Sequence, residues 1–269
     1  MKKLATALVS AAAIMTMSTT AFAAENPAEV FDRVMEKNNT IQSAEIQSGV
    51  HSVILTKDVI PDGQMKVDMA MHAEMDMQDT TDLKYLAQVA SSILGQDSYS
   101  QVFYTDGYYY VDANGVKLKY PMPLEQIISS VQTGVNTSNM ESSYMKGISL
   151  NEVNGKRVLA YEANPKKLNK NVKEALGTVM NTLGTDVNLD MNIQEMKGAY
   201  VLDDNDYIIY MTNYIVYNME VLDQPITCIT LMETEVQNPG EPVVVTLPST
   251  DGYEDLIGLY DGVIESEVE

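Results

Sequence analysis

The sequence predicts an α+β fold in which a large, curved antiparallel β-sheet is wrapped around a few α-helices. Residues 65–78 alternate between apolar and mostly polar side chains, the period of a strand with one buried face. Asx-Gly pairs at 106–107, 114–115 and 154–155 are hairpin signals, and 193–236 is almost entirely β-prone. Because so large a sheet must cover its apolar face, we expect helices against its concave side.

The first segment, Met1 to Ala23, has the pattern of a secretory signal peptide. Two lysines precede an apolar run from Leu4 to Met17, and Ala21-Phe22-Ala23 supplies the small residues of a cleavage site. We therefore expect the mature chain to be secreted. The residue after the cleavage point is Ala24 rather than a lipid-accepting cysteine, which predicts a soluble protein without a lipid anchor.

A helix is predicted immediately after this segment, from Asn26 to about Asn38. Asn26 is a good N-cap, Pro27 suits the first helical position, and Glu29 completes an arrangement that resembles a capping box. An apolar stripe of Val30, Phe31, Val34 and Met35 marks the face that we expect to be buried.

Further helices are expected between the strands. In Thr81–Leu94 the apolar residues recur at three- and four-residue steps before Gly95, which predicts a helix that ends there. Shorter helices are predicted at Pro123–Val131 and around Tyr253–Leu259, and another from Asn164-Pro165 to about Met180. We expect one domain over residues 24–247, followed by an acidic tail over 248–269.

Charge and composition exclude several classes of function. The chain has 17 basic and 38 acidic residues, a formal net charge of −21, so it lacks the clustered cations that nucleic acid requires. One cysteine, Cys228, excludes an intrachain disulfide, and no segment after the signal peptide is long and apolar enough to span a bilayer. Only two histidines occur, and no catalytic motif is present. We expect neither an enzyme nor a cofactor.

Polar residues that could carry chemistry favour structural interpretations. His72 shares a strand face with Asp68, Glu74 and Asp76, but strand neighbours spread along a row, so we expect a solvated face and no metal site. Residues 203–206 resemble a calcium loop in composition, yet lack its Gly and Glu, which favours a hairpin turn. Cys228 has no histidine nearby and is expected to be buried and inert.

The methionine-rich face of residues 65–77 is the most suggestive site. Thioether side chains are flexible and polarizable, and they repack around ligands of variable shape. The alternative is that these methionines form the core against a helix. The residues that we expect to line a ligand space are Met69, Met71, Met75, Leu86, Ile127 and Leu176.

The chain resembles the half-barrel proteins of the LolA and LppX/LprG type. The features that carry the resemblance are the helix that begins at Asn26-Pro27, the hairpin at Phe103–Tyr110, the hairpin at Val153–Val158 and the tyrosine-rich late strands. In that fold a curved antiparallel sheet wraps around helices, and its members carry acyl chains or lipoproteins between the two. The resemblance implies a similar cavity here, but the anchor cysteine of the LppX/LprG branch is absent and no binding motif transfers.

These observations lead to two hypotheses. The first is a secreted, non-enzymatic carrier or binding protein for a lipid, an acyl chain or another hydrophobic small molecule. The second is an extracellular envelope module with a solid core that binds a protein or a wall glycan through its tyrosine-rich sheet. The presence or absence of a ligand-sized apolar space distinguishes the two.

Overall fold

The computed structural model describes residues 25–56, 63–79, 83–124, 126–127, 140–170, 191–221 and 224–256. Within them, α2 (Pro27–Asn38) is the longest helix, the 3-10 turn η1 spans Ser142–Tyr144, and residues 165–170 are helical. The strands are β1 (Ser43–Thr56), β2 (Gln64–Asp76), β3 (Lys84–Ile93), β4 (Gln96–Thr105), β5 (Tyr108–Ala113), β6 (Val116–Pro121), β7 (Met145–Val153), β8 (Lys156–Ala163), β9 (Asn192–Leu202), β10 (Ile208–Val221), β11 (Gln224–Gln237) and β12 (Glu254–Asp255).

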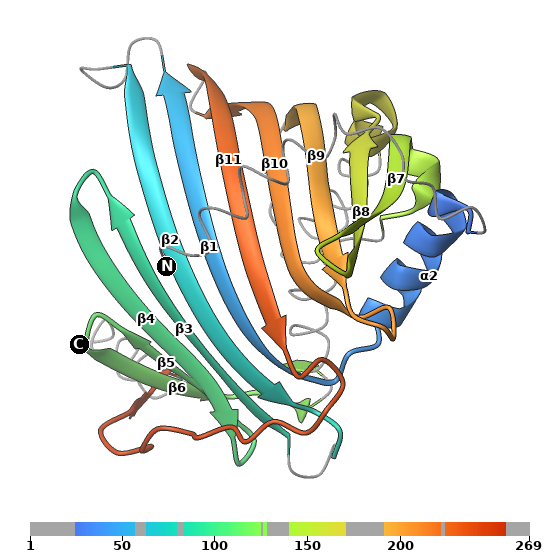
Figure 1. Cartoon of the computed structure of the whole chain (residues 1–269). Coiled ribbons are helices and arrows are strands. Elements are labelled where there is room, and N and C mark those ends of the chain that lie inside the picture. The colour runs from blue at the N-terminus through green and yellow to red at the C-terminus, as the bar shows by residue number, and fades with distance from the viewer. Residues whose placement is uncertain are drawn as a thin grey trace. The chain divides into compact units, whose positions relative to one another are not determined.

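Twelve strands form one sheet among the described residues (Figure 1). Hydrogen bonding gives the order β12-β6-β5-β4-β3-β2-β1-β11-β10-β9-β8-β7. Neighbours from β3 to β6 and from β7 to β11 pair antiparallel, whereas β12 runs parallel to β6. The predicted α+β class, with a large antiparallel sheet and few helices, is confirmed.

The hairpin turns confirm the Asx-Gly prediction. At 106–107, 114–115 and 154–155 both residues of each pair have positive φ, between 51° and 88°. This is the conformation that a type I′ turn requires, and its twist matches that of the flanking strands.

The chain divides into two compact units. Unit 1 comprises residues 1–38, 49–68 and 139–235, and unit 2 comprises 39–48, 69–138 and 236–269. Strands β1, β2 and β11 contribute residues to both units.

In unit 1, α2 packs on one face of strands β7 to β10. The predicted N-cap is present: the Asn26 side chain accepts a hydrogen bond from the Ala28 amide and donates one to Glu29, each at 3.1 Å. The predicted stripe of Val30, Phe31, Val34 and Met35 is buried and meets a core of sheet residues. That core includes Leu159, Tyr161, Ile193, Tyr200, Leu202 and Ile208.

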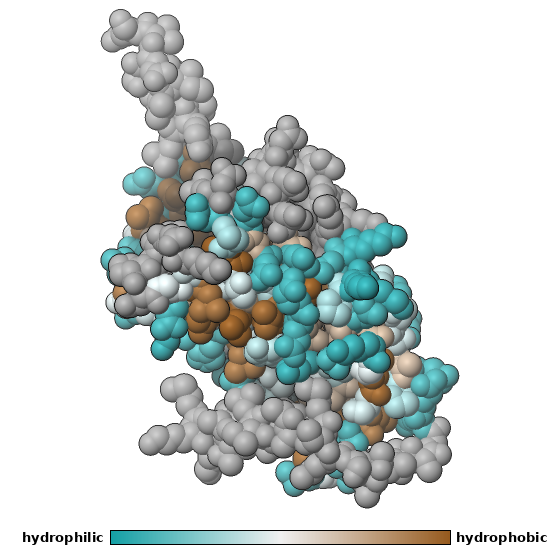
Figure 2. Space-filling model, turned by 90° about the horizontal axis from the view of Figure 1, so that it is seen from above, coloured by the Kyte–Doolittle hydropathy of each residue, from teal (hydrophilic) through white to brown (hydrophobic). Residues whose placement is uncertain are grey.

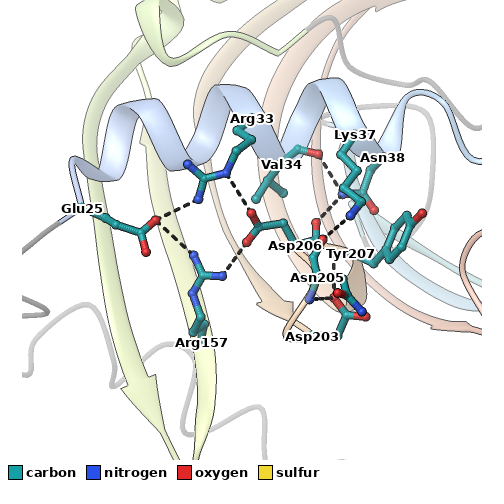
Figure 3. Close-up of polar contacts among 10 residues, drawn as sticks. All are labelled: Glu25, Arg33, Val34, Lys37, Asn38, Arg157, Asp203, Asn205, Asp206 and Tyr207. Atoms are coloured by element: carbon teal, nitrogen blue, oxygen red, sulfur yellow. Dashed lines mark hydrogen bonds and ion pairs between the residues drawn. The ribbon is translucent and has the colours of Figure 1, made fainter.

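Ion pairs attach α2 to the turn between β9 and β10 (Figure 3). Arg33 of α2 donates to Asp206 and to Glu25, both at 2.8 Å, and Arg157 of β8 donates to the other oxygen of Asp206. The turn itself is closed by Asp203, whose side chain accepts from two amides, those of Asn205 and Tyr207. The predicted hairpin turn at 203–206 is therefore confirmed, and its charges are used in holding the helix.

In unit 2, strands β3 to β6 bury side chains on both faces. We name the side that carries Met75, Met77 and Tyr104 the methionine face, and the side that carries Leu86, Phe103 and Tyr110 the phenylalanine face. The phenylalanine face is covered by the segment after β11, where Val245 and Tyr253 are buried against Phe103.

The helix predicted at Thr81–Leu94 is wrong, because residues 84–93 form strand β3. Leu86 and Ala87 are adjacent and both buried, since they point to opposite faces of a sheet that is covered on both sides. Two-sided burial places apolar residues at spacings that imitate a helix. Leu94 and Gly95, at φ of 53° and 77°, form the β3–β4 hairpin turn and not a helix end.

The other predicted helices lie partly outside the described residues. The helix that begins after Asn164 is present over 165–170, and Ile127 closes a helical turn onto the Pro123 carbonyl at 3.2 Å. Where a helix was expected from Tyr253, residues 254–255 instead form β12 beside β6, and the segment from residue 257 lies outside the described range.

Candidate functional site

The methionine row of β2 runs from accessible to buried along one strand. Met75 and Met77 are buried in the core of unit 2, Met71 is half-buried, and the Met69 side chain is 40% exposed. Alternation keeps these side chains on one face. Among the described residues, the row therefore continues a closed core into apolar side chains that remain partly accessible.

The strands beside β2 extend this surface in cross-strand rows. In the first row, Tyr85, Tyr104, Tyr109 and Tyr120 face one another in register on β3 to β6. The next row on the same face consists of Ala87, Val102, Val111 and Leu118. We name these sets the tyrosine row and the apolar row.

The apolar row is only partly covered. Ala87 is buried, whereas Val102, Val111 and Leu118 remain half-buried, and Val116, one step further along the methionine face, is 61% exposed. Figure 2 shows apolar side chains gathered in patches among hydrophilic ones on the side seen there. A large contiguous apolar surface is one signature of an interaction site.

The tyrosine row contributes polar groups at the edge of this surface. Burial is the largest cause that raises the pKa of Tyr85, Tyr109 and Tyr120, and the nearby hydroxyls of Tyr85 and Tyr120 add to the effect on Tyr109. The rings of Tyr109 and Tyr120 are 5.5 Å apart, centroid to centroid. These phenols therefore stay protonated at neutral pH and act as uncharged hydrogen-bond donors.

The residues predicted to line a ligand space are only partly brought together. Met75 and Ile127 pack in the same core cluster, and Met69 and Met71 continue that face into the accessible part. Leu86 packs against Phe103 on the phenylalanine face, because its segment is a strand and not a helix. Leu176 lies outside the described residues.

Tyr85 and the apolar row were not predicted from the sequence. Val102 alternates with Tyr104, and Val111 with Tyr109, so the period-two signal was present in β4 and β5. Tyr85 was missed because its segment was interpreted as a helix. Register across four strands cannot be read from spacing along one strand, and it is register that assembles the rows.

Other polar groups make pairs that hold the sheet. His51 contacts Asp68 at 2.7 Å, and His72 contacts Glu45 at 3.1 Å. In the part of the chain that the structure describes, no group of three or more His, Cys, Asp or Glu side chains is arranged to hold a metal ion. Cys228 is buried, as predicted.

The chain matches one protein family. A model described as a family of unknown function, DUF6612, matches residues 26–247. The chain belongs to the DUF6612 family. No curated protein matches this DUF6612 chain. Within the described ranges, none of its helices has the length and hydropathy needed to cross a membrane.

Solved structures similar to the DUF6612 chain include LprF from Mycobacterium bovis, with 10% identity, a TM-score of 0.35, and coverage of 83% of this chain and 97% of its own. The lipoprotein LppX from Mycobacterium tuberculosis has 9% identity and a TM-score of 0.34. The match covers 82% of this chain and 100% of LppX. A β-barrel-like protein from Brucella abortus, of the domain of unknown function DUF1849, has 10% identity and a TM-score of 0.25. The match covers 74% of this chain and 100% of that protein. LppX, the type of protein that the sequence resembles, is therefore among these structural matches.

Proposed function

We propose that this DUF6612 protein is a secreted, non-enzymatic carrier or binding protein for a lipid, an acyl chain or another hydrophobic ligand. The observation that carries the proposal is the methionine face of unit 2, where Met69, Met71 and the apolar row remain partly accessible beside a closed core. Methionine and valine side chains bury a hydrocarbon chain without making or breaking bonds.

The length of the ligand's acyl chain determines whether its burial is sufficient for binding. Each buried methylene contributes about 0.8 kcal/mol, so ten contribute about 8 kcal/mol. Association costs about 4–15 kcal/mol in lost freedom of motion. We therefore expect measurable affinity only for long chains, with binding that strengthens steadily from about ten to about sixteen carbons.

The test is a binding series with the mature protein. N-phenyl-1-naphthylamine reports an apolar site by its fluorescence, and fatty acids of increasing length compete with it. Met71→Gln keeps the volume and adds an amide to the face, so it should weaken probe binding about fivefold to tenfold. Met145→Gln, at a half-buried methionine of β7 in unit 1, is the matched control and should leave the affinity within twofold.

Native mass spectrometry after gentle purification, followed by lipid extraction, provides independent support if it detects a co-purified apolar molecule. A ligand-free protein that also fails to enhance the fluorescence of the probe would refute carriage and favour the solid-core interaction module.

Secretion is tested separately. We expect the exported protein to begin at Ala24, one residue before Glu25, whose carboxylate pairs with Arg33 at 2.8 Å. Amino-terminal sequencing of material recovered outside the cytoplasm checks this expectation. Retention of the intact leader in the cytoplasmic fraction would contradict it.

A further inference from the structure

The tyrosine row presents hydroxyl groups that the described part of the protein leaves unused. Tyr104 donates to the Met122 carbonyl at 3.3 Å. Within the described residues, the hydroxyls of Tyr85, Tyr109 and Tyr120 make no hydrogen bond, and each of these side chains is half-buried. A half-buried donor without a protein partner retains its capacity to bind a ligand oxygen.

The three tyrosines belong to one cross-strand row. Tyr109 and Tyr120 face each other in register on β5 and β6, and Tyr85 lies two strands from Tyr109 on the same face. Adjacent strands are about 4.8 Å apart, so the row spans about 14 Å from β3 to β6. A head group with several oxygens is large enough to reach more than one of these donors.

The row also lies directly beside the apolar row. Along β3, β4, β5 and β6, the next residue on the same face is Ala87, Val102, Val111 and Leu118, respectively. Donors at one edge of an apolar surface match an amphiphile whose chain lies on the surface and whose head reaches the donors. A pure hydrocarbon would leave the donors unused.

The charges around the row favour an uncharged head. Burial raises the pKa of the three phenols, so they stay neutral and supply no positive charge to pair with an anionic head. Both lysines of β6 are on the opposite face: the Lys117 ammonium is 5.2 Å from the centroid of the Tyr253 ring, and that of Lys119 is 5.3 Å from the centroid of the Tyr108 ring. The net charge of −21 further disfavours an anionic ligand.

We propose that Tyr85, Tyr109 and Tyr120 bind the uncharged, oxygen-bearing head of an acyl lipid of the acylglycerol class, whose chain lies on the apolar row. This inference rests on the proposed carrier function and names its ligand class. Ester carbonyl and hydroxyl oxygens of the glycerol head accept hydrogen bonds from neighbouring phenols of the row.

The test compares two competitors of equal chain length, 1-monomyristoylglycerol and myristate, for displacement of N-phenyl-1-naphthylamine from the full mature chain at pH 7.5. We expect the glycerol ester to bind at least tenfold more tightly than the anion. Tyr109→Phe and Tyr120→Phe each remove one hydroxyl and keep the ring. Each should weaken ester binding about threefold to tenfold relative to binding of the probe, the equivalent of one neutral hydrogen bond.

Tyr108→Phe is the matched control, because Tyr108 is on the opposite face of β5 and packs with Tyr110. It should leave both affinities unchanged. Circular dichroism verifies that each variant is folded, and Tyr120→Phe, at the edge of the row, provides a second variant if Tyr109→Phe does not fold.

The outcomes separate the two proposals. If the wild-type protein binds the probe but prefers myristate, or if the phenylalanine variants retain the ester preference, the head-group assignment is wrong and the carrier function stands. If the wild-type protein binds neither probe nor ester, the carrier function fails as well.

Discussion

Tyr161 of β8 and Tyr200 of β9 lie with ring centroids 5.2 Å apart and planes inclined by 33°, both buried beneath Phe31 of α2 in unit 1. Burial is the largest cause that raises the pKa of both hydroxyls, that of Tyr200 to about 12 and that of Tyr161 well above its ordinary value. At a pH just above 10, these two phenols therefore stay protonated in the folded protein, whereas they would ionise in the unfolded chain.

We predict that stability decreases steeply in alkali. The folded pKa values are raised above the unfolded value of about 10, so the contribution is complete below pH 10 and is lost as pH rises. Between pH 10 and 12 the free energy of unfolding should decrease by about 1.4 kcal/mol per pH unit for each tyrosine that stays protonated. Urea unfolding at pH 8 to 12, with tyrosinate absorbance at 295 nm, measures it. Ionisation of all tyrosines before unfolding would contradict the prediction.

Asp206 is predicted to be the main electrostatic attachment of α2. Asp206→Asn removes the charge that pairs with Arg33 and Arg157, and the half-buried Arg157 then loses its closest partner. We expect a loss of about 1–3 kcal/mol in the free energy of unfolding. Glu162→Gln breaks the exposed pair with Lys146 and serves as the control, with a change of about 0.5 kcal/mol or less. Equal effects of both substitutions would contradict this prediction.

The same carboxylate predicts part of the acid dependence. Burial raises the pKa of Asp206, but hydrogen bonds from Arg33 and Arg157 outweigh it, so the pKa is lowered overall. Its contribution is therefore present above the ordinary value near 4 and is lost as pH decreases through the lowered pKa. Urea unfolding between pH 2 and 6 should show a weaker pH dependence for Asp206→Asn than for the wild-type protein. An unchanged slope would count against this assignment.

Gly198 is predicted to tolerate no side chain. A methyl group at this position would lie 2.6 Å from the Thr212 carbonyl and 2.9 Å from the Tyr161 hydroxyl, in a buried part of β9. Gly198→Ala should destabilise the protein by about 2 kcal/mol or more through overpacking. Gly147→Ala, where nothing lies within 4 Å, is the matched control and should be nearly neutral. Thermal unfolding of the two variants tests the difference, and similar melting temperatures would refute the packing argument.

The segment after β11 is predicted to stabilise unit 2 through alternate side chains. Val245 is buried against the phenylalanine face, whereas the neighbouring Val244 is 89% exposed. Val245→Ala should reduce the free energy of unfolding by about 1–2 kcal/mol, while Val244→Ala should change it by about 0.5 kcal/mol or less. Guanidinium titration measures both. A loss at Val244 as large as that at Val245 would show that burial is not the cause.

Features that depend on neighbours along the chain were predictable. The Asn26 cap, the buried stripe of α2 and the Asx-Gly turns arise from residues within a few positions of one another, and the structure contains all of them. The β2 alternation is similarly local, and its strand is confirmed. The strand at 84–93 was mispredicted, because burial on both faces removes the period-two signal on which a strand prediction depends.

The candidate site depended on information that no single segment contains. Tyr85 and Tyr120 belong to one row only because β3, β4, β5 and β6 pair in one particular register, and a shift by one residue would turn each side chain to the other face. Likewise, only the packing shows that Met75 is closed in the core while Met69 stays accessible.

The amino-acid sequence by itself therefore determined the class of fold, the first helix with its cap, the clearest strand and the turns, since propensity and periodicity act over short stretches of chain. Only the tertiary structure decided which faces of β3 are covered, how the charges of the 203–206 turn hold α2, and which tyrosines meet beside the apolar row. These features arise from contacts between distant segments, and cross-strand register and burial, not local preference, set their energies.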